Sequence, residues 1–198
     1  AEGNVGTLSK WISKEESRIP TYATHQVGVG AIVINSIKDE ILVVREKRRN
    51  FRPWKIPGGL AELGEDLDEA VVREVYEETG IKCRFQSVLG VRHVHGVQFG
   101  RSDLFFVCRL EPIPNEDGNV PHPVPQEGEI EAASWLPLDE YRDMVNHEDV
   151  KIGHPMMKTI LDVVDGGHAL ERWIVESVVP GRKPSPVYHA PIIRPDEK

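Results

Sequence analysis

The sequence predicts a single domain of strands and helices, of the α/β or α+β class, and three observations support this. Runs rich in Val and Ile alternate along the chain with stretches of helical periodicity. The length of 198 residues suits one domain with extensions. A hydrophobic content of 39% and a charged content of 28% are those of an ordinary globular chain that can build a core.

The first half of the chain predicts a β-hairpin that leads into a glycine-containing loop. VGVGAIVI (27–34) and EILVVRE (40–46) have the composition of strands, and NSIKD between them has that of a turn. In WKIPGG (54–59), one Pro and two Gly require a strand to end in a loop with little side-chain bulk. We expect residues 1–24 to form an N-terminal arm, or the remainder of a segment that has been removed.

The middle of the chain predicts one helix followed by two strands. Residues 66–79 have helical periodicity, and Gly80 suits the position after the last turn. Two apolar strand-like runs follow, IKCRFQSVLGVRHV (81–94) and DLFFVCRLEP (103–112). A loop rich in Pro, Gly and acidic residues then spans 112–129, and loops of this length are often functional.

The last third predicts further elements and a tail. A short strand from Glu129 runs into a helix for which Asp139 is the expected N-cap. A second helix covers 154–167, with Pro155 in its first turn and Gly166 past its end. RWIVESVVP is the expected last strand. We therefore place the main domain at 25–180 and a Pro-rich C-terminal tail at 181–198.

The helix over 66–79 carries acidic residues on the side that should face the core. At 100° per residue, Glu78 lies about 40° from Glu74, inside the sector occupied by Leu67, Val71 and Val75. Carboxylates on a core-facing stripe cost several kcal/mol unless they are paired or bound to a metal. Acidic residues on a helix are ordinarily surface decoration, but this placement favours a cation site, and Mg²⁺ prefers oxygen ligands.

Charge along the chain supports a cation bound beside a polyanion. The net charge is -8. Residues 59–80 hold eight acids against Arg73, whereas residues 45–55 hold six basic residues against Glu46. The basic run can supply counter-charge to phosphates, although a solvated hairpin end explains any single Arg in it equally well. The acidic balance argues against a protein that coats nucleic acid.

Cysteine and histidine usage gives no zinc motif. Cys83 and Cys108 each lie in an apolar run and are expected to be buried, reduced thiols. The eight histidines are scattered along the sequence. No apolar run approaches the roughly 18 residues that a membrane-spanning helix needs.

The segment GLAELGEDLDEAVVREVYEETGI (59–81) resembles the Nudix box, Gx5Ex7REUxEExGU with U apolar, at every fixed position. The resemblance implies the Nudix fold, an α/β/α sandwich with a mixed β-sheet between helices. It also implies metal-dependent hydrolysis of a nucleoside diphosphate linked to another moiety, with Mg²⁺ or Mn²⁺ as the cofactor. The flanks resemble one Nudix subgroup, which contains the animal protein encoded antisense to basic fibroblast growth factor and plant hydrolases of ADP-ribose and NADH.

The resemblance also implies roles for individual residues. The implied metal ligands are Glu74, Glu77, Glu78 and the carbonyl of Gly58, with Glu65 as an outer ligand. Arg73 would orient the glutamates by salt bridging. Glu129, or alternatively Glu127, would be a further acid from the loop. The implied catalytic residues are thus Glu77, Glu129 and Arg73, with either Glu77 or Glu129 as the base that accepts a proton from the attacking water.

Substrate specificity remains open from the sequence. ADP-ribose or NADH follows from the whole-domain resemblance, while the short secondary signatures of Nudix subclasses are missing around HGVQF (95–99). Alternatives are a diphosphoinositol polyphosphate hydrolase, a hydrolase of damaged nucleoside triphosphates, and a non-catalytic module that senses a nucleotide or binds a protein. The candidate substrate-binding side chains are those of Arg45, Arg52, Trp54, Lys55, Arg92 and Phe99.

Partners and compartment are expectations of the same kind. We expect a small nucleotide substrate, no nucleic acid, no membrane, and a possible homodimer. We expect a cytoplasmic protein, while organelle targeting stays open because the chain begins at Ala1 and looks trimmed relative to the subgroup.

Overall fold

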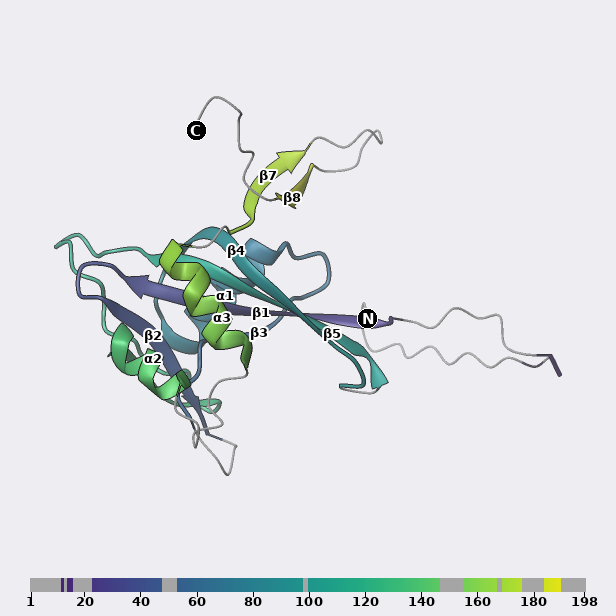
Figure 1. Cartoon of the computed structure of the whole chain (residues 1–198), viewed down its shortest axis with the longest axis horizontal. Helices are drawn as coiled ribbons and strands as arrows, with labels where there is room; N and C mark the ends of the chain where they lie inside the picture. The colour runs from purple at the N-terminus through teal and green to yellow at the C-terminus, as the bar shows by residue number, and fades with distance from the viewer. Residues whose placement is uncertain are drawn as a thin grey trace.

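The computed structural model of the chain describes residues 12, 14–15, 23–47, 53–97, 100–146, 155–166, 169–175 and 184–189. Figure 1 shows the strands crossing the centre of the molecule, with α3 in front of them. The elements within these ranges, in chain order, are β1 (His25–Asn35), β2 (Glu40–Glu46), β3 (Gly58–Leu60), α1 (Leu67–Thr79), β4 (Cys83–Val94), β5 (Ser102–Pro112), β6 (Ile130–Pro137), α2 (Leu138–Asn146), α3 (Pro155–Gly166), β7 (Glu171–Val175) and β8 (Ser185–His189).

The main sheet is mixed, with the order β4-β5-β1-β2-β6. Strand β1 runs parallel to β5 and antiparallel to β2 and β3. Its first half pairs with β3 through Gly28–Gly30, and its end pairs with β2 at Ile34 and Asn35. The hairpin expected from 27–34 and 40–46 is confirmed. The antiparallel pairing of the strands expected at 81–94 and 103–112 is seen in β4 and β5.

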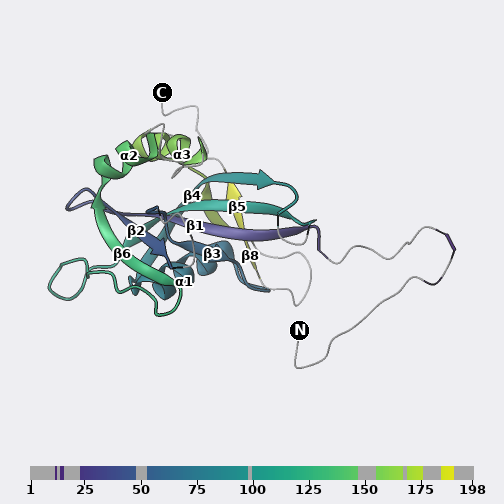
Figure 2. The same cartoon turned by 90° about the horizontal axis from the view of Figure 1, so that it is seen from below.

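Alternation along β1 divides the core between the two faces of the sheet. Val29, Ala31 and Val33 point to one face, where Ala70, Val71 and Val75 of α1 pack against them. Ile32 and Ile34 point to the other face, which α2 and α3 cover with residues such as Tyr141, Ile160 and Leu161. Figure 2 shows α2 and α3 on one side of the sheet and α1 on the other. The expected α/β/α sandwich is therefore confirmed.

Several element boundaries differ from the expectations. Helix α2 begins at Leu138, so Asp139 lies in its first turn and is not the N-cap. Helix α3 includes Gly166 as its last residue, where the sequence placed Gly166 past the end. Glycine is a poor helix former, but a single glycine in the last turn costs little because that turn is already only partly hydrogen-bonded.

The C-terminal region contains a hairpin in part of the stretch expected to be a tail. Strand β8, within 181–198, pairs antiparallel with β7. The hairpin lies against α1 and β4: the Tyr188 hydroxyl donates to Asp68 at 3.3 Å, and Arg172 forms an ion pair with Asp68 at 3.0 Å. These partners lie more than 100 residues from Asp68 in the sequence, so local pattern carried no signal for them. The domain bounds 25–180 stay a prediction.

Both cysteines are buried and free, as expected. No helix in the described ranges is long and apolar enough to cross a bilayer. The expected N-terminal arm lies almost entirely outside the described residues.

The long loop between β5 and β6 is fastened to the end of α1. The Val124 N–H donates to the carbonyl of Thr79 at 2.8 Å, and the Gln126 N–H donates to the carbonyl of Glu78 at 3.1 Å. These bonds satisfy two of the carbonyls that a helix leaves unpaired at its C-terminus. Trp135 adds a third attachment, since its indole N–H donates to the carbonyl of Pro121 at 3.0 Å. The loop is thereby held next to the acidic face of α1.

Candidate active site

Strand β3, helix α1 and the end of the long loop enclose a hollow of about 470 Å³. Gly58 and Gly59 of β3, four residues of α1 and two residues of the loop contribute to its lining. Its lining contains five carboxylates and one guanidinium. The residues are Gly58, Gly59, Leu60, Ala61, Glu62, Arg73, Glu74, Glu77, Glu78, Gln126 and Glu129.

Arg73 organises the carboxylates around this hollow. Its guanidinium binds Glu65 through two nitrogens, at 2.7 Å and 2.9 Å. The Nη1 atom also donates to Glu74 at 2.9 Å and to Glu77 at 3.1 Å. Nη2 donates to the carbonyl of Leu60 at 3.0 Å, which ties the helix to β3. Glu69, four residues before Arg73 on the helix, accepts the N–H of Asp66 at 3.2 Å, as in a capping box.

Glu78 is the most buried acid of the set, with 5% of its surface exposed. One carboxylate oxygen accepts the backbone N–H of Gly58 at 2.9 Å. Burial raises the pKa of Glu78 to about 7, although the Lys55 charge and the Gly58 hydrogen bond oppose this. The pKa of Glu74 is also raised by burial, against the opposing effect of Arg73. Glu65 behaves oppositely, because its hydrogen bond from Arg73 lowers its pKa.

Gly59 leaves the space that the Glu74 carboxylate occupies. A Cβ atom at position 59 would lie 2.5 Å from Glu74 Oε2 and 2.6 Å from Oε1. Gly58 is constrained differently: it has φ +154°, and a Cβ there would collide with the carbonyl oxygen of Val29. Strand β3 can therefore approach both β1 and α1 only because two consecutive residues lack side chains.

The donor set fits a hard divalent cation such as Mg²⁺. Its atoms are carboxylate oxygens, and burial raises the pKa of Glu78, so a cation beside this carboxylate would offset the cost of burying its charged form. In the described part of the chain, no three ligating side chains converge on one point, and Arg73 holds Glu74 and Glu77 instead. Mg²⁺ does not require such a cage, because it keeps several waters and commonly binds through one or two carboxylates and substrate phosphates.

The loop brings two further side chains to the hollow. Glu129 was predicted, and its backbone carbonyl accepts the N–H of Lys47 at 2.9 Å, which fixes it beside the end of β2. Glu127, the alternative, lines an adjoining hollow with Glu46 and not the one that contains Glu78. Gln126 lines both hollows and was not predicted from the sequence. Its backbone bond to Glu78 places it there, and no sequence pattern reports that bond.

Four predicted substrate-binding residues, Arg45, Trp54, Lys55 and Arg92, do not line this hollow. The Arg45 guanidinium stacks 4.2 Å from the ring centre of Trp54, and Lys55 forms an ion pair with Glu46. Arg92 pairs with the buried Asp103 at 3.0 Å and lies over the ring of Phe105. Arg45, Lys55 and Arg92 therefore each have a partner within the fold. Arg52 and Phe99 lie outside the described residues.

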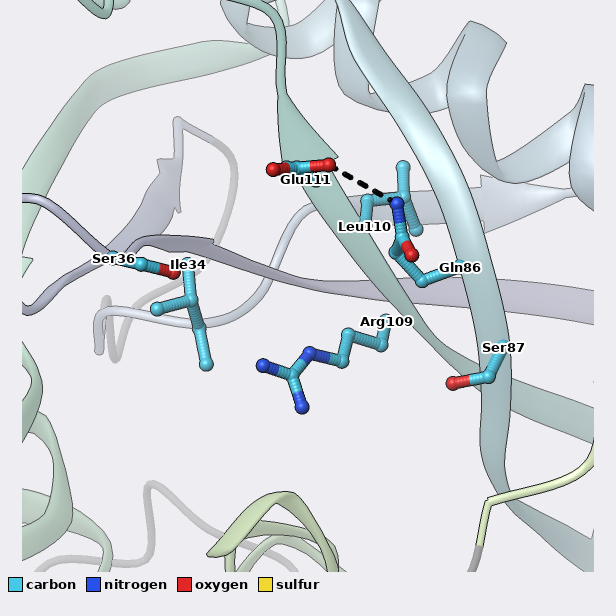
Figure 3. A pocket seen from close by; sticks show the side chains of 7 residues that line it. All are labelled: Ile34, Ser36, Gln86, Ser87, Arg109, Leu110 and Glu111. Carbon is cyan, nitrogen blue, oxygen red and sulfur yellow. Dashed lines mark hydrogen bonds between the residues drawn. The ribbon is translucent and has the colours of Figure 1, made fainter.

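A second hollow of about 350 Å³ opens on the α3 side of the sheet and has a different character. Figure 3 shows the Arg109 guanidinium extending away from the neighbouring side chains, while Gln86 is hydrogen-bonded to Glu111. One guanidinium and one carboxylate that already has a partner do not form a cation site. The acidic hollow against α1 is therefore the candidate active site.

Comparisons with known proteins show the family of this chain. The family model described as NUDIX domain matches residues 24–157. Nudix hydrolase 2 of Arabidopsis thaliana is 46% identical over 144 residues, which cover 71% of this chain and 49% of that protein. Nucleoside diphosphate-linked moiety X motif 6 of Xenopus laevis is 46% identical over 115 residues, covering 57% of this chain and 53% of that protein. The chain thus spans about half the length of these curated relatives.

A solved structure of a NUDIX hydrolase also aligns with this chain. A NUDIX hydrolase from Nitrosomonas europaea aligns with a TM-score of 0.54 at 26% identity, over 72% of this chain and 90% of that one. The sequence relatives match the predicted subgroup. The chain belongs to the NUDIX domain family.

Proposed function

We propose that this chain hydrolyses the P–O–P bridge of a nucleoside diphosphate linked to another moiety, with ADP-ribose or NADH as the substrate. The observation that carries this proposal is the set of carboxylates that Arg73 arranges beside Gly58 and Gly59. The name of the Xenopus laevis relative describes the same broad class of compound. The choice of ADP-ribose or NADH rests on the whole-domain resemblance to the plant hydrolases.

Glu74, Glu77 and Glu78 would hold Mg²⁺ or Mn²⁺, with the Gly58 carbonyl as a further ligand. The cation supplies neutralisation of the diphosphate and a lowered pKa for bound water. Glu78 is suited to direct ligation, because a cation would offset the burial of its charge. Arg73 positions Glu74 and Glu77 and is itself held by Glu65, so Glu65 acts through Arg73.

We assign the general base to Glu129. Its carboxylate lines the hollow and is exposed, and it has no hydrogen bond or ion pair to another residue in the described part of the chain. Glu77, by contrast, is bonded to Arg73 at 3.1 Å, so one of its carboxylate oxygens is already engaged. A base must accept a proton during the reaction, so the unpaired carboxylate suits the role better.

A substrate panel with the purified chain tests the proposed function. ADP-ribose, NADH, a diphosphoinositol polyphosphate and an oxidised nucleoside triphosphate would each be incubated with Mg²⁺, and products identified by chromatography. We expect AMP from ADP-ribose or NADH, and a loss on the order of 10²-fold or more in Glu78→Gln. If only one of the other compounds is hydrolysed, the proposal of ADP-ribose or NADH as the substrate is wrong. Binding without turnover across the panel would favour a nucleotide-sensing module.

Two variants separate the roles of Glu77 and Glu129. Glu129→Gln should lower kcat by about 10²-fold while leaving the Mg²⁺ concentration for half-maximal activity unchanged. Glu77→Gln should raise that Mg²⁺ concentration. The reverse pattern would assign the base to Glu77, and near-wild-type rates in both variants would refute both roles.

A further inference from the structure

Three histidines that are scattered in the sequence meet at one end of the main sheet. His25 is the first residue of β1, and His93 and His95 lie near the end of β4 and just beyond it, on the far side of β5. The Nε2 atoms of His25 and His93 face each other at 2.9 Å. The rings of His93 and His95 have centroids 4.3 Å apart. All three side chains are exposed, so solvent ions reach them.

Hydroxyl groups hold the outer nitrogens of two of these rings. Thr24 Oγ1 lies 2.9 Å from His25 Nδ1, and Ser102 Oγ lies 2.8 Å from His95 Nδ1. A histidine that ligates a metal through one nitrogen usually has the other nitrogen hydrogen-bonded to an oxygen, which fixes the tautomer and the ring orientation. In His25 and His95 this leaves Nε2 as the nitrogen available to a ligand.

We propose that His25, His93 and His95 form a second metal site, which takes a transition-metal ion of the Zn²⁺ type through imidazole nitrogen. It is chemically distinct from the carboxylate hollow against α1, since imidazole suits Zn²⁺, Cu²⁺ and Ni²⁺, whereas Mg²⁺ prefers oxygen. The ion would connect the start of β1 to the end of β4, two points separated by 68 residues in the chain.

The existing geometry needs only a small adjustment for the first two ligands. Two nitrogens bound to one tetrahedral Zn²⁺ at 2.0–2.1 Å lie about 3.3 Å apart. His25 and His93 therefore have to open by a few tenths of an ångström from their present 2.9 Å. No three ligating side chains in the described ranges converge as they stand, so His95 must rotate to complete the site. Its ring is exposed, and it must keep or exchange the bond to Ser102 as it turns. Water would fill the fourth position.

The native chain offers Zn²⁺ no competing thiolate in the described part of the structure. Cys83 and Cys108 are buried, and burial raises the pKa of each thiol to about 12, so neither is a ready ligand. Saturating Mg²⁺ would occupy the carboxylate hollow, so added Zn²⁺ would be left with nitrogen ligands.

The test is a calorimetric titration of the whole chain with Zn²⁺ in saturating Mg²⁺, together with thermal unfolding with and without Zn²⁺. We expect one Zn²⁺ per chain and a higher Tm, because a ligand that binds only the folded state stabilises it. His25→Gln and His93→Gln should each abolish the calorimetric signal and the Tm increase. Thr24→Val and Ser102→Ala should weaken binding by roughly tenfold, as expected for groups that orient ligands.

His122→Gln is the matched control, because His122 is exposed on the long loop, far along the chain from this cluster. It should bind Zn²⁺ as the unaltered chain does. Hydrolytic activity with Mg²⁺ serves as the check on folding, since none of these histidines lines the acidic hollow. Binding that survives in His25→Gln and His93→Gln, or that Mg²⁺ displaces, would overturn the proposal and leave a hydrogen-bonded histidine pair.

Discussion

Gly59→Ala is expected to disable the candidate active site without unfolding the protein. The added Cβ would lie 2.5 Å from Glu74 Oε2, so the carboxylate must retreat by roughly 0.9 Å to reach ordinary contact at 3.4 Å. Arg73 holds that carboxylate at 2.9 Å, so the displacement also disturbs the shared guanidinium. A misplacement of about 1 Å in a catalytic geometry can cost about 10²-fold in rate, or about 2.7 kcal/mol of transition-state stabilisation.

The assay is steady-state kinetics on the preferred compound of the panel, with the Tm measured in parallel. Gly90→Ala is the matched control, because its Cβ would meet Ile160 Cδ1 at 2.6 Å, a similar collision in the core beneath α3. Gly90→Ala should lower stability by about 1–3 kcal/mol, as overpacking does, and leave kcat/KM unchanged. If Gly59→Ala keeps kcat/KM within about threefold of the original, Glu74 does not act from the position described above.

Two further predictions concern Glu78 and Arg73. Burial raises the pKa of Glu78 from 4.5 to about 7. Between these two pH values, the metal-free folded state keeps a proton that the unfolded chain releases. The free energy of unfolding should therefore fall as the pH rises through this range. Urea unfolding in EDTA should show this loss of unfolding free energy, at most about 3 kcal/mol. The loss should disappear in Glu78→Gln and in the original chain with added Mg²⁺. The same dependence of unfolding free energy on pH in all three cases would contradict the burial argument. Arg73→Lys should lower kcat/KM by about 10- to 100-fold, because one ammonium cannot replace the paired bonds to Glu65. A double-mutant cycle with Glu65→Gln should be less than additive, with exposed Arg84→Lys as the control, and full additivity would mean that the two residues act separately.

The acidic face of α1 could be predicted because helical geometry is local. A helical projection at 100° per residue placed Glu74 and Glu78 among Leu67, Val71 and Val75, and Glu78 is indeed buried. The same projection placed Glu77 at the edge of the apolar sector, and the Glu77 side chain is 47% exposed. These positions depend only on residues within four turns of helix, where the backbone spacing is fixed.

Contacts that depend on the path of the chain could not be predicted in this way. Gln126 reaches the hollow through a backbone hydrogen bond, which any residue type could make. Arg92 was expected near a substrate, but the β4–β5 register brings it to the buried Asp103. The histidines looked scattered because His25 and His93 become neighbours only when β5 lies between β1 and β4. Strand order is a tertiary property, and residue spacing does not encode it.

The way the long loop is fastened has a consequence for how this domain can change. Its attachments to α1 and to Trp135 begin at Pro121, while its outer turn closes on itself: the Asn115 N–H donates to the carbonyl of Asn119, and the Gly118 N–H donates to the carbonyl of Asn115. Extra residues inserted in that turn would lengthen the loop without moving Glu129, because the bonds described above hold the loop from Pro121 to Glu129 against α1, Trp135 and Lys47. The turn is therefore a place where a tag, a reporter or a new recognition element can be added. Its length can also change during evolution while Glu129 keeps its position at the hollow.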